Sequence, residues 1–533
     1  MGSLFRGLSP CESAALMPSP FVSRLRSFAG SSRPAVVDDA TSRSFAELFD
    51  RALAASSSLR AGAPSLEGRR VILLATPGAA WVEAFFGVLL GGGVAVPLSP
   101  LYPPSELAWF ADDAGADAIV ISDDLADRAA LMTRDRRVFR AADLGDGPAR
   151  EGQGDATDAL SPDATALLLY TSGTTGKPKG AMISHENLAV QARLVGEAWG
   201  FHEGDRLLHA LPLHHLHGLG ISLLTALCAG ATARMLPRFD AARVWDELSR
   251  GDKSVWMAVP TMYAKLLEAF DAASSASQDR CAGAARSLRL ATSGSAALPV
   301  TLADRWRKIA GEIPLERFGM TEIGVGLTNP LNPAGRRPGY VGLPLPSVEV
   351  KLVDDAGHLS ESGPAELWIR GPSVFKGYWG RSDATASAFP DNDGWFRTGD
   401  IAERAPDGYI RLLGRTSVDI LKSGGYKLSA LEIEEALREN AAVAEVAVVG
   451  VPDATWGERV VAAVVPVPGR EAECEADRLR AWAKDRLASY KIPREVVTVT
   501  SLPRNALGKV VKPDLVRALT AGLATPPAGG ARP

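Results

Sequence analysis

The chain has 533 residues, of which 46% are hydrophobic and 23% are charged, and its net charge at pH 7 is −4. This length exceeds what a single hydrophobic core usually serves, so we expect two or more domains. The charge gives no reason to expect a nucleic-acid partner, and no apolar run is long enough to form an integral membrane segment.

The first 35 residues differ in composition from the rest of the chain. They contain four arginines but a single acidic residue, Glu12, and in this they resemble a mitochondrial transit peptide. Residues 1–30 are therefore a candidate disordered or targeting segment, and Met17 is an alternative start to Met1. We expect a cytoplasmic protein, with the mitochondrial matrix as the alternative if residues 1–30 are a transit peptide.

Strand-like apolar runs alternate with helical patterns in the first part of the chain. The expected strands are 71–75, 94–96 and 119–121, and the expected helices are 81–90 and 104–114. Strands separated by helices predict βαβ units, and hence a largely parallel sheet covered on both faces.

The pattern changes at about residue 340. Short strands separated by turn dipeptides such as Asp393-Gly394 and Asp407-Gly408 predict a small antiparallel, barrel-like subdomain. After Arg415, helix and strand patterns return in an order that predicts a separate α+β domain. These stretches are 431–439, 443–449, 460–465 and 477–487.

The segment Tyr170-Thr-Ser-Gly-Thr-Thr-Gly-Lys-Pro-Lys-Gly180 is the most informative in the chain. It places hydroxyls, glycines and two lysines directly after the apolar run 166–170. A strand that opens into such a loop presents backbone N–H groups and cations to an anion, and glycine permits its close approach. A Walker A motif is excluded, because only two residues separate Gly173 from Gly176 where that motif needs four. The segment therefore predicts a phosphate-binding loop.

This loop resembles the signature of the adenylate-forming superfamily, which comprises acyl-CoA synthetases, luciferases and peptide-synthetase adenylation domains. Further strings of that superfamily follow in order at 316–322, 394–400, 421–428 and 502–509. The resemblance implies an α/β fold with ATP and Mg²⁺ as cofactors and CoA as co-substrate. It implies a large N-terminal domain, with parallel β/α subdomains and a small β-barrel-like subdomain, followed by a small mobile α+β lid.

The domain limits follow from these strings. We expect the N-terminal domain over 1–415, the lid over 419–524 and a disordered tail over 525–533. Three residues, rather than the two common in the family, separate Gly414-Arg415 from Asp419. The hinge therefore lies within 416–418, and the sequence does not select the pivot.

For the nucleotide, the resemblance implies a phosphate loop, an adenine-binding segment and a ribose clamp. The ribose would lie on a carboxylate, because its two oxygens accept hydrogen bonds from two vicinal hydroxyls. The residues assigned in this way are Thr171, Ser172, Gly173, Thr174, Thr175, Gly176, Lys177, Lys179, Ser293, Gly294, Ser295, Ala296, Arg317, Phe318, Gly319, Asp400 and Arg415.

The catalytic residues are implied by the same resemblance. Glu322, with Thr174, would hold magnesium, because a hard cation that bridges phosphate oxygens needs a carboxylate, and Thr321 would touch the α-phosphate. Lys509 resembles the catalytic lysine. The reaction joins an anionic carboxylate to an anionic phosphate, so a cation placed between them lowers the barrier.

The lid would serve both half-reactions. The resemblance implies that a large rotation replaces Lys509, used in adenylation, by Gly424 and Gly425, which would line a narrow tunnel for the pantetheine arm of CoA.

Five histidines cluster between residues 202 and 217. A metal site is disfavoured, because no Cys, Asp or Glu ligand set accompanies them. Residues 213–218 instead resemble the family's segment beside the acyl pocket, which implies that His217 lies nearest the substrate carboxylate.

The substrate is indicated by a narrower resemblance, to malonyl-CoA synthetases, over about residues 30–515. The strings that carry it are 211–218, 257–263, 289–299 and 336–342. A second substrate carboxylate requires fixed cations, and guanidinium groups supply bidentate donors. Arg289 and Arg336 are the candidates. Arg337 is the alternative to Arg336, and surface ion pairing is the alternative role for both.

The resemblance therefore implies a ligase that converts malonate, or methylmalonate, into an acyl-adenylate and then a CoA thioester. The enzymatic alternatives are an acyl-CoA synthetase for a medium-chain or aromatic acid, and a stand-alone adenylation enzyme that loads an acyl-carrier protein. A non-catalytic nucleotide-binding relative is disfavoured, because Lys509, Glu322 and Asp400 are all present.

Overall fold

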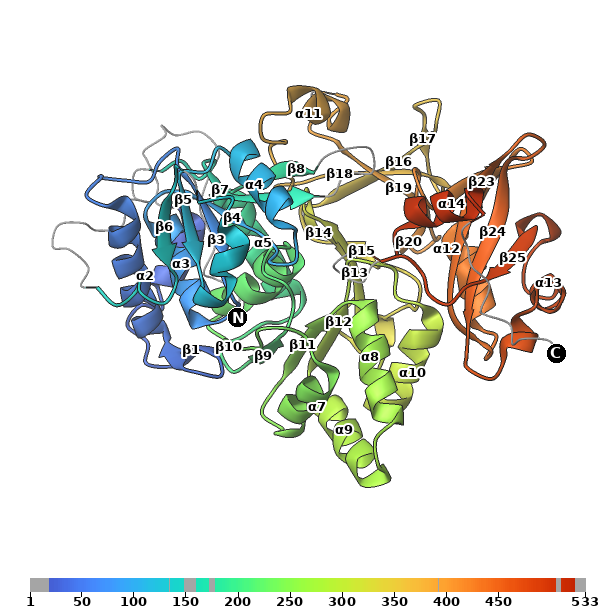
Figure 1. Cartoon of the computed structure of the whole chain (residues 1–533), viewed down its shortest axis with the longest axis horizontal. Helices are drawn as coiled ribbons and strands as arrows, with labels where there is room; N and C mark the ends of the chain where they lie inside the picture. The colour runs from blue at the N-terminus through green and yellow to red at the C-terminus, as the bar shows by residue number, and fades with distance from the viewer. Residues whose placement is uncertain are drawn as a thin grey trace. The chain divides into compact units, whose positions relative to one another are not determined.

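A computed structural model of the chain describes residues 19–133, 135–147, 160–171, 178–391, 393–504 and 510–522. The chain forms two compact units, one of Met1–Leu169 with Gly180–Val190 and one of Tyr170–Lys179 with Gln191–Pro533. Figure 1 labels most of the helices and strands and colours the chain from its N-terminus to its C-terminus. This division falls inside the N-terminal domain that the sequence predicts. No local pattern marks it, because the chain passes back and forth between the units.

The first unit contains a six-stranded sheet with the order β6-β5-β3-β4-β7-β8. Strand β3 pairs in parallel with both β4 and β5, which confirms the predicted βαβ arrangement. All four residues of β5 are buried, as expected for a strand covered on both faces. The strands are β3 (Arg70–Leu74), β4 (Val94–Pro97), β5 (Ala118–Ile121), β6 (Arg137–Arg140), β7 (Thr165–Thr171) and β8 (Lys179–Ser184).

Two helices of this unit, α2 (Phe45–Arg60) and α3 (Ala79–Leu90), pack closely together. Helix α2 begins with a capping box, in which Ser44 and Glu47 each accept the other's backbone N–H. Gly87 permits the close approach, because a Cβ there would lie 2.7 Å from the Cβ of Ala55. The other elements are β1 (Pro34–Val37), β2 (Ser42–Ser44), α4 (Pro104–Asp113), η1 (Asp123–Ala129) and the start of α5 (His185–Ala198).

The structure describes the N-terminal segment from Ser19 onward, so residues 19–30 of the candidate disordered or targeting segment lie in the described part of the chain. Helix α1 (Pro20–Arg26) follows Ser19, and the side chains of Phe21 and Val22 are buried. The Ser19 hydroxyl also makes a 2.9 Å hydrogen bond with Nδ1 of His185. The sequence could not show these contacts, because they join residues far apart in the chain.

The second unit contains a sheet in which β10, β9, β11, β12 and β13 are parallel neighbours in that order. Strands β14 and β15 continue it beyond β13 in antiparallel pairing. These strands are β9 (Arg206–His209), β10 (Thr232–Met235), β11 (Val255–Ala258), β12 (Leu290–Ser293), β13 (Leu315–Met320), β14 (Gly324–Thr328) and β15 (Leu343–Pro344).

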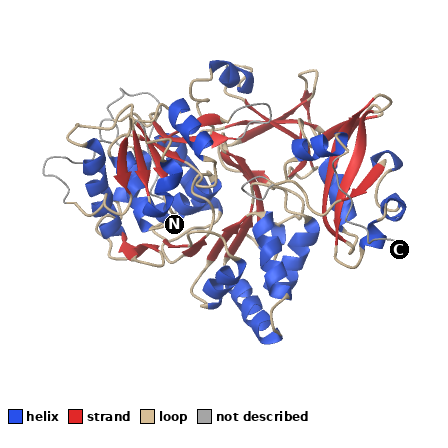
Figure 2. Cartoon of the chain, in the orientation of Figure 1, coloured by secondary structure: helices blue, strands red, loops and turns tan. Residues whose placement is uncertain are grey.

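Four helices of the second unit pack together beside this sheet (Figures 1 and 2). They are α7 (Ala241–Ser249), α8 (Pro260–Asp271), α9 (Ser275–Ser287) and α10 (Val300–Ala310). The rings of Trp245 and Trp306 stack with centroids 5.9 Å apart, and Tyr263 meets Trp306 edge-on. The shorter helices are the π-helix η3 (His217–Leu224), α6 (Thr225–Cys228) and η4 (Pro333–Gly335).

The segment after residue 340 forms the predicted antiparallel β-structure. It is a five-stranded sheet with the order β17-β16-β18-β19-β20, open rather than closed into a barrel in the part that the structure describes. Its elements are β16 (Glu349–Val353), β17 (Leu359–Ser360), β18 (Ala365–Arg370), α11 (Ser382–Ala388), β19 (Phe396–Arg404) and β20 (Ile410–Arg415).

The C-terminal part, from Asp419 onward, has its own sheet with the order β22-β21-β24-β23, and β25 on β24. Alternate residues of β23 enter two different cores: Val446 and Val448 pack with α12 and α13, whereas Ala447 and Val449 pack with α14. Its elements are β21 (Ile420–Ser423), β22 (Tyr426–Ser429), α12 (Ala430–Arg438), β23 (Val443–Asp453), β24 (Gly457–Pro466), η5 (Glu471–Cys474), α13 (Ala476–Lys484), η6 (Ser489–Lys491), β25 (Glu495–Thr498) and α14 (Lys512–Thr520).

Among the described helices, none has both the length and the apolar character needed to cross a membrane.

Candidate active site

Several of the predicted site residues lie at the carboxyl ends of parallel strands in the second unit. Strands β9, β11, β12 and β13 are parallel, so their carboxyl ends lie at the same edge. Ser293 ends β12 and is followed by Gly294, Ser295 and Ala296, while β13 ends at Met320 just before Thr321 and Glu322. Ligands of open α/β sheets bind at such an edge.

His217 and Ser295 meet in this region. Nδ1 of His217 lies 3.0 Å from Oγ of Ser295, which has a positive φ of 68° that is uncommon outside glycine. Burial, together with the charge of Arg317, holds the pKa of His217 well below its ordinary value. The imidazole is therefore neutral at pH 7 and can exchange a hydrogen bond without carrying charge.

Arg317 lies on β13 beside Gly294. A Cβ at Gly294 would lie 2.5 Å from Cζ of Arg317, so only glycine fits against this guanidinium. The arginine is 3% exposed, and neither its Nε nor its Nη2 has a hydrogen-bond partner in the described residues. Burial lowers the pKa of Arg317 to about 9, which still leaves it charged at pH 7. A buried cation without a partner is costly, so it is a candidate anion-binding group.

Arg289 and Arg336, the two arginines predicted to hold a substrate carboxylate, are engaged elsewhere. Arg289 makes a bidentate ion pair with Asp205, with contacts of 2.9 and 2.6 Å, and donates to the Trp199 carbonyl. Nη1 and Nη2 of Arg336 donate to the carbonyls of Ile313 and Leu331 at 2.8 and 2.7 Å. Both arginines therefore have structural partners; Arg289 is in an ion pair, whereas Arg336 is buried and donates to backbone carbonyls.

The alternative residue, Arg337, is also engaged. It forms an ion pair with Asp407, and its guanidinium lies 4.3 Å from the centroid of the Tyr409 ring.

Glu322, the predicted magnesium ligand, is buried and has a close partner that the sequence did not single out. The hydroxyl of Tyr378 donates to Oε1 of Glu322 at 2.8 Å. Nζ of Lys179 lies 5.2 Å from the centroid of the same tyrosine ring. Tyr378 therefore joins a predicted phosphate-binding lysine to the predicted metal ligand. Thr321 precedes Glu322 and is partly buried.

Asp400 and Arg415 are brought together by the register of β19 and β20, in which they are direct partners. Nε of Arg415 lies 3.0 Å from Oδ1 of Asp400. Arg415 also acts on Tyr378, where its charge partly offsets the rise in the phenol pKa that burial and Glu322 cause. Asp400, Arg415, Tyr378 and Glu322 thus form one polar region.

Several predicted residues lie outside the described part of the chain. They are Ser172, Gly173, Thr174, Thr175, Gly176, Lys177 and Lys509. Of the loop, Thr171 and Lys179 are described, and the Thr171 hydroxyl lies 3.5 Å from the Lys179 carbonyl oxygen.

Gly424 and Gly425 form the two-residue turn between β21 and β22, with φ values of 58° and 85°. Two consecutive positive φ angles favour glycine at both positions. The N–H of Gly424 donates to the Trp456 carbonyl at 2.9 Å, and a Cβ on Gly424 would lie 3.0 Å from the Trp456 ring.

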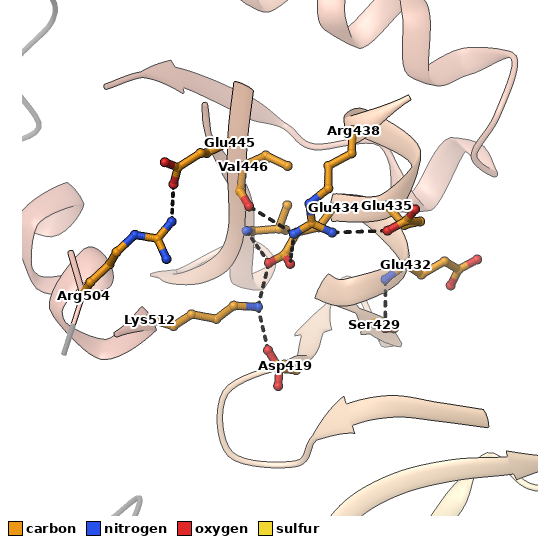
Figure 3. A network of polar contacts seen from close by, with 11 residues as sticks. Asp419, Ser429, Glu432, Glu434, Glu435, Arg438, Glu445, Val446, Arg504 and Lys512 are labelled. Carbon is orange, nitrogen blue, oxygen red and sulfur yellow. Dashed lines mark hydrogen bonds and ion pairs between the residues drawn. The ribbon is translucent and has the colours of Figure 1, made fainter. Parts of the chain in front are cut away.

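The segment expected to act as a hinge is fastened at both ends. The N–H and the hydroxyl of Thr416 both donate hydrogen bonds to the Gly399 carbonyl, at 3.0 and 3.1 Å. These bonds attach Thr416 to β19. Asp419 is held by Nζ of Lys512 at 2.6 Å, and Lys512 also lies 2.8 Å from Oε1 of Glu434 (Figure 3). Burial opposes the Lys512 charge, but Glu434 and Asp419 hold its pKa above the ordinary value.

The histidine cluster is mostly buried. His209, His214, His215 and His217 all have pKa values lowered by burial, and Nε2 of His209 contacts the Gly218 carbonyl at 2.9 Å. In the described residues, no group of three or more His, Cys, Asp or Glu side chains is arranged to hold a metal ion.

Comparisons with known proteins identify the family of the chain. Residues 27–379 match the family model of AMP-binding enzymes, and residues 432–509 match that of the AMP-binding enzyme C-terminal domain. The chain therefore belongs to the family of AMP-binding enzymes, and the predicted superfamily is confirmed.

Individual relatives are similar over most of the chain. The malonate–CoA ligase ACSF3, mitochondrial, of Mus musculus is 38% identical and covers 93% of this chain and 90% of its own length. The malonate–CoA ligase of Arabidopsis thaliana is 39% identical, over 86% of this chain and 79% of its own. The crystal structure of ATP-bound MatB from Rhodopseudomonas palustris superposes with a TM-score of 0.85 at 33% identity, over 95% of this chain and all of its own.

Proposed function

We propose that this enzyme is a malonyl-CoA synthetase, an AMP-forming acid–thiol ligase. Malonate attacks the α-phosphate of ATP to give malonyl-adenylate and pyrophosphate, and the thiol of CoA then displaces AMP to give malonyl-CoA. The observation that carries the substrate assignment is the buried guanidinium of Arg317 beside His217 and Gly294, whose Nε and Nη2 have no hydrogen-bond partner among the described residues. The similarity to malonate–CoA ligases supports it.

The distal carboxylate of malonate is proposed to bind Arg317 rather than Arg289 or Arg336. Arg317 is charged, buried and without an ion-pair partner in the described residues, whereas the other two already donate to Asp205 or to backbone carbonyls. A carboxylate placed against Nε and Nη2 would satisfy both orphaned nitrogens with charge-assisted hydrogen bonds. We therefore propose for Arg317 the role that the sequence suggested for Arg289 and Arg336, in place of the nucleotide-binding role that the resemblance implied for it.

His217 is proposed to orient the reacting carboxylate. Because the imidazole is neutral, it can hydrogen-bond to the substrate carboxylate without neutralising the carboxylate's charge. The carboxylate therefore keeps its nucleophilicity. Its contact with Ser295 fixes the ring orientation.

Magnesium and ATP fit the residues of the polar region. Glu322 offers the hard oxygen ligand that magnesium prefers, and the Asp400 carboxylate offers acceptors for ribose hydroxyls. When bound, magnesium neutralises charge on the phosphates. Thr321, Lys179 and Lys509 are proposed to contact the phosphates, with Lys509 stabilising the negative charge that develops during adenylation.

The lid is proposed to alternate between the two half-reactions, with the pivot at Ser417 and Val418. Thr416 is bonded to β19 on one side, and Asp419 is bonded to Lys512 and to the Ala430 N–H on the other. Rotation about the two residues between them would break the bonds that Arg415 makes within this turn. It would also break the bonds from the Ser429 hydroxyl to the Leu413 carbonyl and from the Thr301 N–H to Glu435. Gly424 and Gly425 are proposed to contact the pantetheine arm.

The acceptor and the cellular location are also proposals. We infer that free CoA is the acceptor, with an acyl-carrier protein as the alternative. We retain a cytoplasmic location, with the mitochondrial matrix as the alternative that the mitochondrial relative favours.

The test is pyrophosphate release across mono- and dicarboxylic acids, with and without CoA. We expect the highest kcat/KM with malonate, thioester formation only with CoA, and malonate-dependent release that is lost in Arg317→Met. Arg307→Met is the matched control, because this arginine pairs with Asp304 on an exposed helix face. Preference for a medium-chain or aromatic acid would support the alternative enzyme class, and transfer only to a carrier protein would replace CoA as the acceptor.

A further inference from the structure

Tyr378 lies between two residues predicted to bind magnesium-ATP, Glu322 and Lys179. No sequence motif assigned a role to Tyr378 itself. Its hydroxyl donates to Oε1 of Glu322 at 2.8 Å, and Nζ of Lys179 lies 5.2 Å from its ring centroid. Lys179 enters from β8, Glu322 follows β13, and Tyr378 lies in the loop between β18 and α11. Three separate segments of the chain therefore meet at this side chain.

We propose that Tyr378 is a positioning residue for magnesium-ATP, which sets the orientation of the Glu322 carboxylate through its hydroxyl and of Lys179 through its ring. This inference rests on the proposed function, because it assumes that Glu322 and Lys179 serve the nucleotide.

The hydroxyl can orient Glu322 without using up its metal-binding capacity. A carboxylate has four lone-pair directions, and one phenol donor takes a single direction on Oε1. The remaining directions stay available to a cation. Partners of this kind typically change metal affinity 10- to 100-fold when they are removed. The ring face, in turn, attracts the Lys179 ammonium.

A purely structural role for the hydroxyl is disfavoured, because other bonds already fasten this loop. The Ser373 hydroxyl donates to the Ile323 carbonyl and the Phe375 N–H to the Glu322 carbonyl, both at 2.8 Å. The N–H of Tyr378 donates to Oγ1 of Thr385 at 2.9 Å. The bond from the phenol is thus additional, and it is directed at the carboxylate.

The test uses calorimetric ATP binding by the full-length protein at a series of Mg²⁺ concentrations and in EDTA. Tyr378→Phe keeps the ring but removes the hydroxyl. We expect the Mg²⁺ concentration for half-maximal enhancement of ATP binding to rise about tenfold, with affinity in EDTA unchanged. Tyr378→Leu removes the ring as well and should also weaken binding in EDTA. Tyr409→Phe, which removes a partly buried hydroxyl bonded to the Gly335 carbonyl, should change neither quantity.

A double-mutant cycle distinguishes positioning from a general effect on folding. If Tyr378 acts through Glu322, Tyr378→Phe should not shift the Mg²⁺ dependence further in a Glu322→Gln background. An unchanged Mg²⁺ dependence in the single variant, or an equal shift in both backgrounds, would overturn the inference. Wild-type protein whose ATP binding ignores Mg²⁺ would overturn it too. Absence of acid-dependent pyrophosphate release from wild type would count against the proposed function itself.

Discussion

Nζ of Lys512 lies 2.6 Å from Oδ1 of Asp419, so the first turn of α14 is joined directly to the residue that follows the expected hinge (Figure 3). The same ammonium contacts Glu434 on α12, which in turn accepts the Val448 N–H and pairs with Arg438. The hinge end, α12, α14 and β23 are therefore held as one polar network.

Lys512→Met should destabilise this C-terminal part, because it leaves the partly buried carboxylate of Asp419 and the buried carboxylate of Glu434 without their shared cation. Loss of one partner of a buried pair costs about 3–5 kcal/mol. Hydrogen exchange of α12 and β23 should increase strongly in the variant. Lys484→Met, at an exposed position of α13, is the control and should leave exchange unchanged. Unaltered exchange in Lys512→Met would show that the network contributes little.

We predict that the buried carboxyl group of Glu316 makes the free energy of unfolding depend on pH. Burial raises its pKa to about 8, even though its carboxylate accepts the Leu298 N–H at 3.1 Å. The native state therefore holds a proton that the unfolded state releases above about pH 4.5. The protonated Glu316 carboxyl therefore contributes to the free energy of unfolding. This contribution is complete below about pH 4.5 and is lost as the pH rises through 8.

Glu316→Gln should remove this loss, so that the free energy of unfolding falls less between pH 5 and 8.5 than in wild type. Denaturant unfolding across that range measures it, with Glu361→Gln at an exposed position as the control. Parallel pH profiles for wild type and Glu316→Gln would mean that Glu316 is ionised in the folded protein.

Lys509→Ala should impair adenylation but not thioester formation, because the lysine is proposed to leave the site when the lid rotates. Loss of a cation that stabilises developing charge costs on the order of 10²-fold in rate. Pyrophosphate release should fall by that factor, while conversion of synthetic malonyl-adenylate and CoA should continue near the wild-type rate. Equal loss in the two half-reactions would contradict a lysine that serves only one of them.

The local strings of the sequence predicted the family and most of the elements near the site. Strands β3, β4 and β5 lie where apolar runs indicated them, and Glu322, Asp400 and Arg415 fall into one polar region. These strands and site residues could be predicted because each depends on residues close together in the chain or on a motif recognised as a whole.

The roles of single charged residues could not be predicted in this way. Arg289 pairs with Asp205, 84 residues away, and Tyr378 bonds Glu322 across 56 residues. Arg317 is buried without a hydrogen-bond partner for Nε or Nη2 among the described residues, and no local pattern shows this. Partner choice over such separations is set by packing, so the sequence offered Arg289 and Arg336 as equally plausible cations.

The most direct test of the account is kcat/KM for malonate and for butyrate in wild type, Arg317→Met and Arg336→Met. Removal of Arg317 should leave the distal carboxylate of malonate poorly paired, at a cost of about 2–5 kcal/mol. We therefore predict that wild type prefers malonate and that Arg317→Met loses at least about 30-fold for malonate. In that variant butyrate turnover and ATP affinity should hold, and Arg336→Met should not reproduce this selectivity. A wild-type preference for butyrate, or equal loss for both acids in Arg317→Met, would contradict the assignment of malonate and of Arg317.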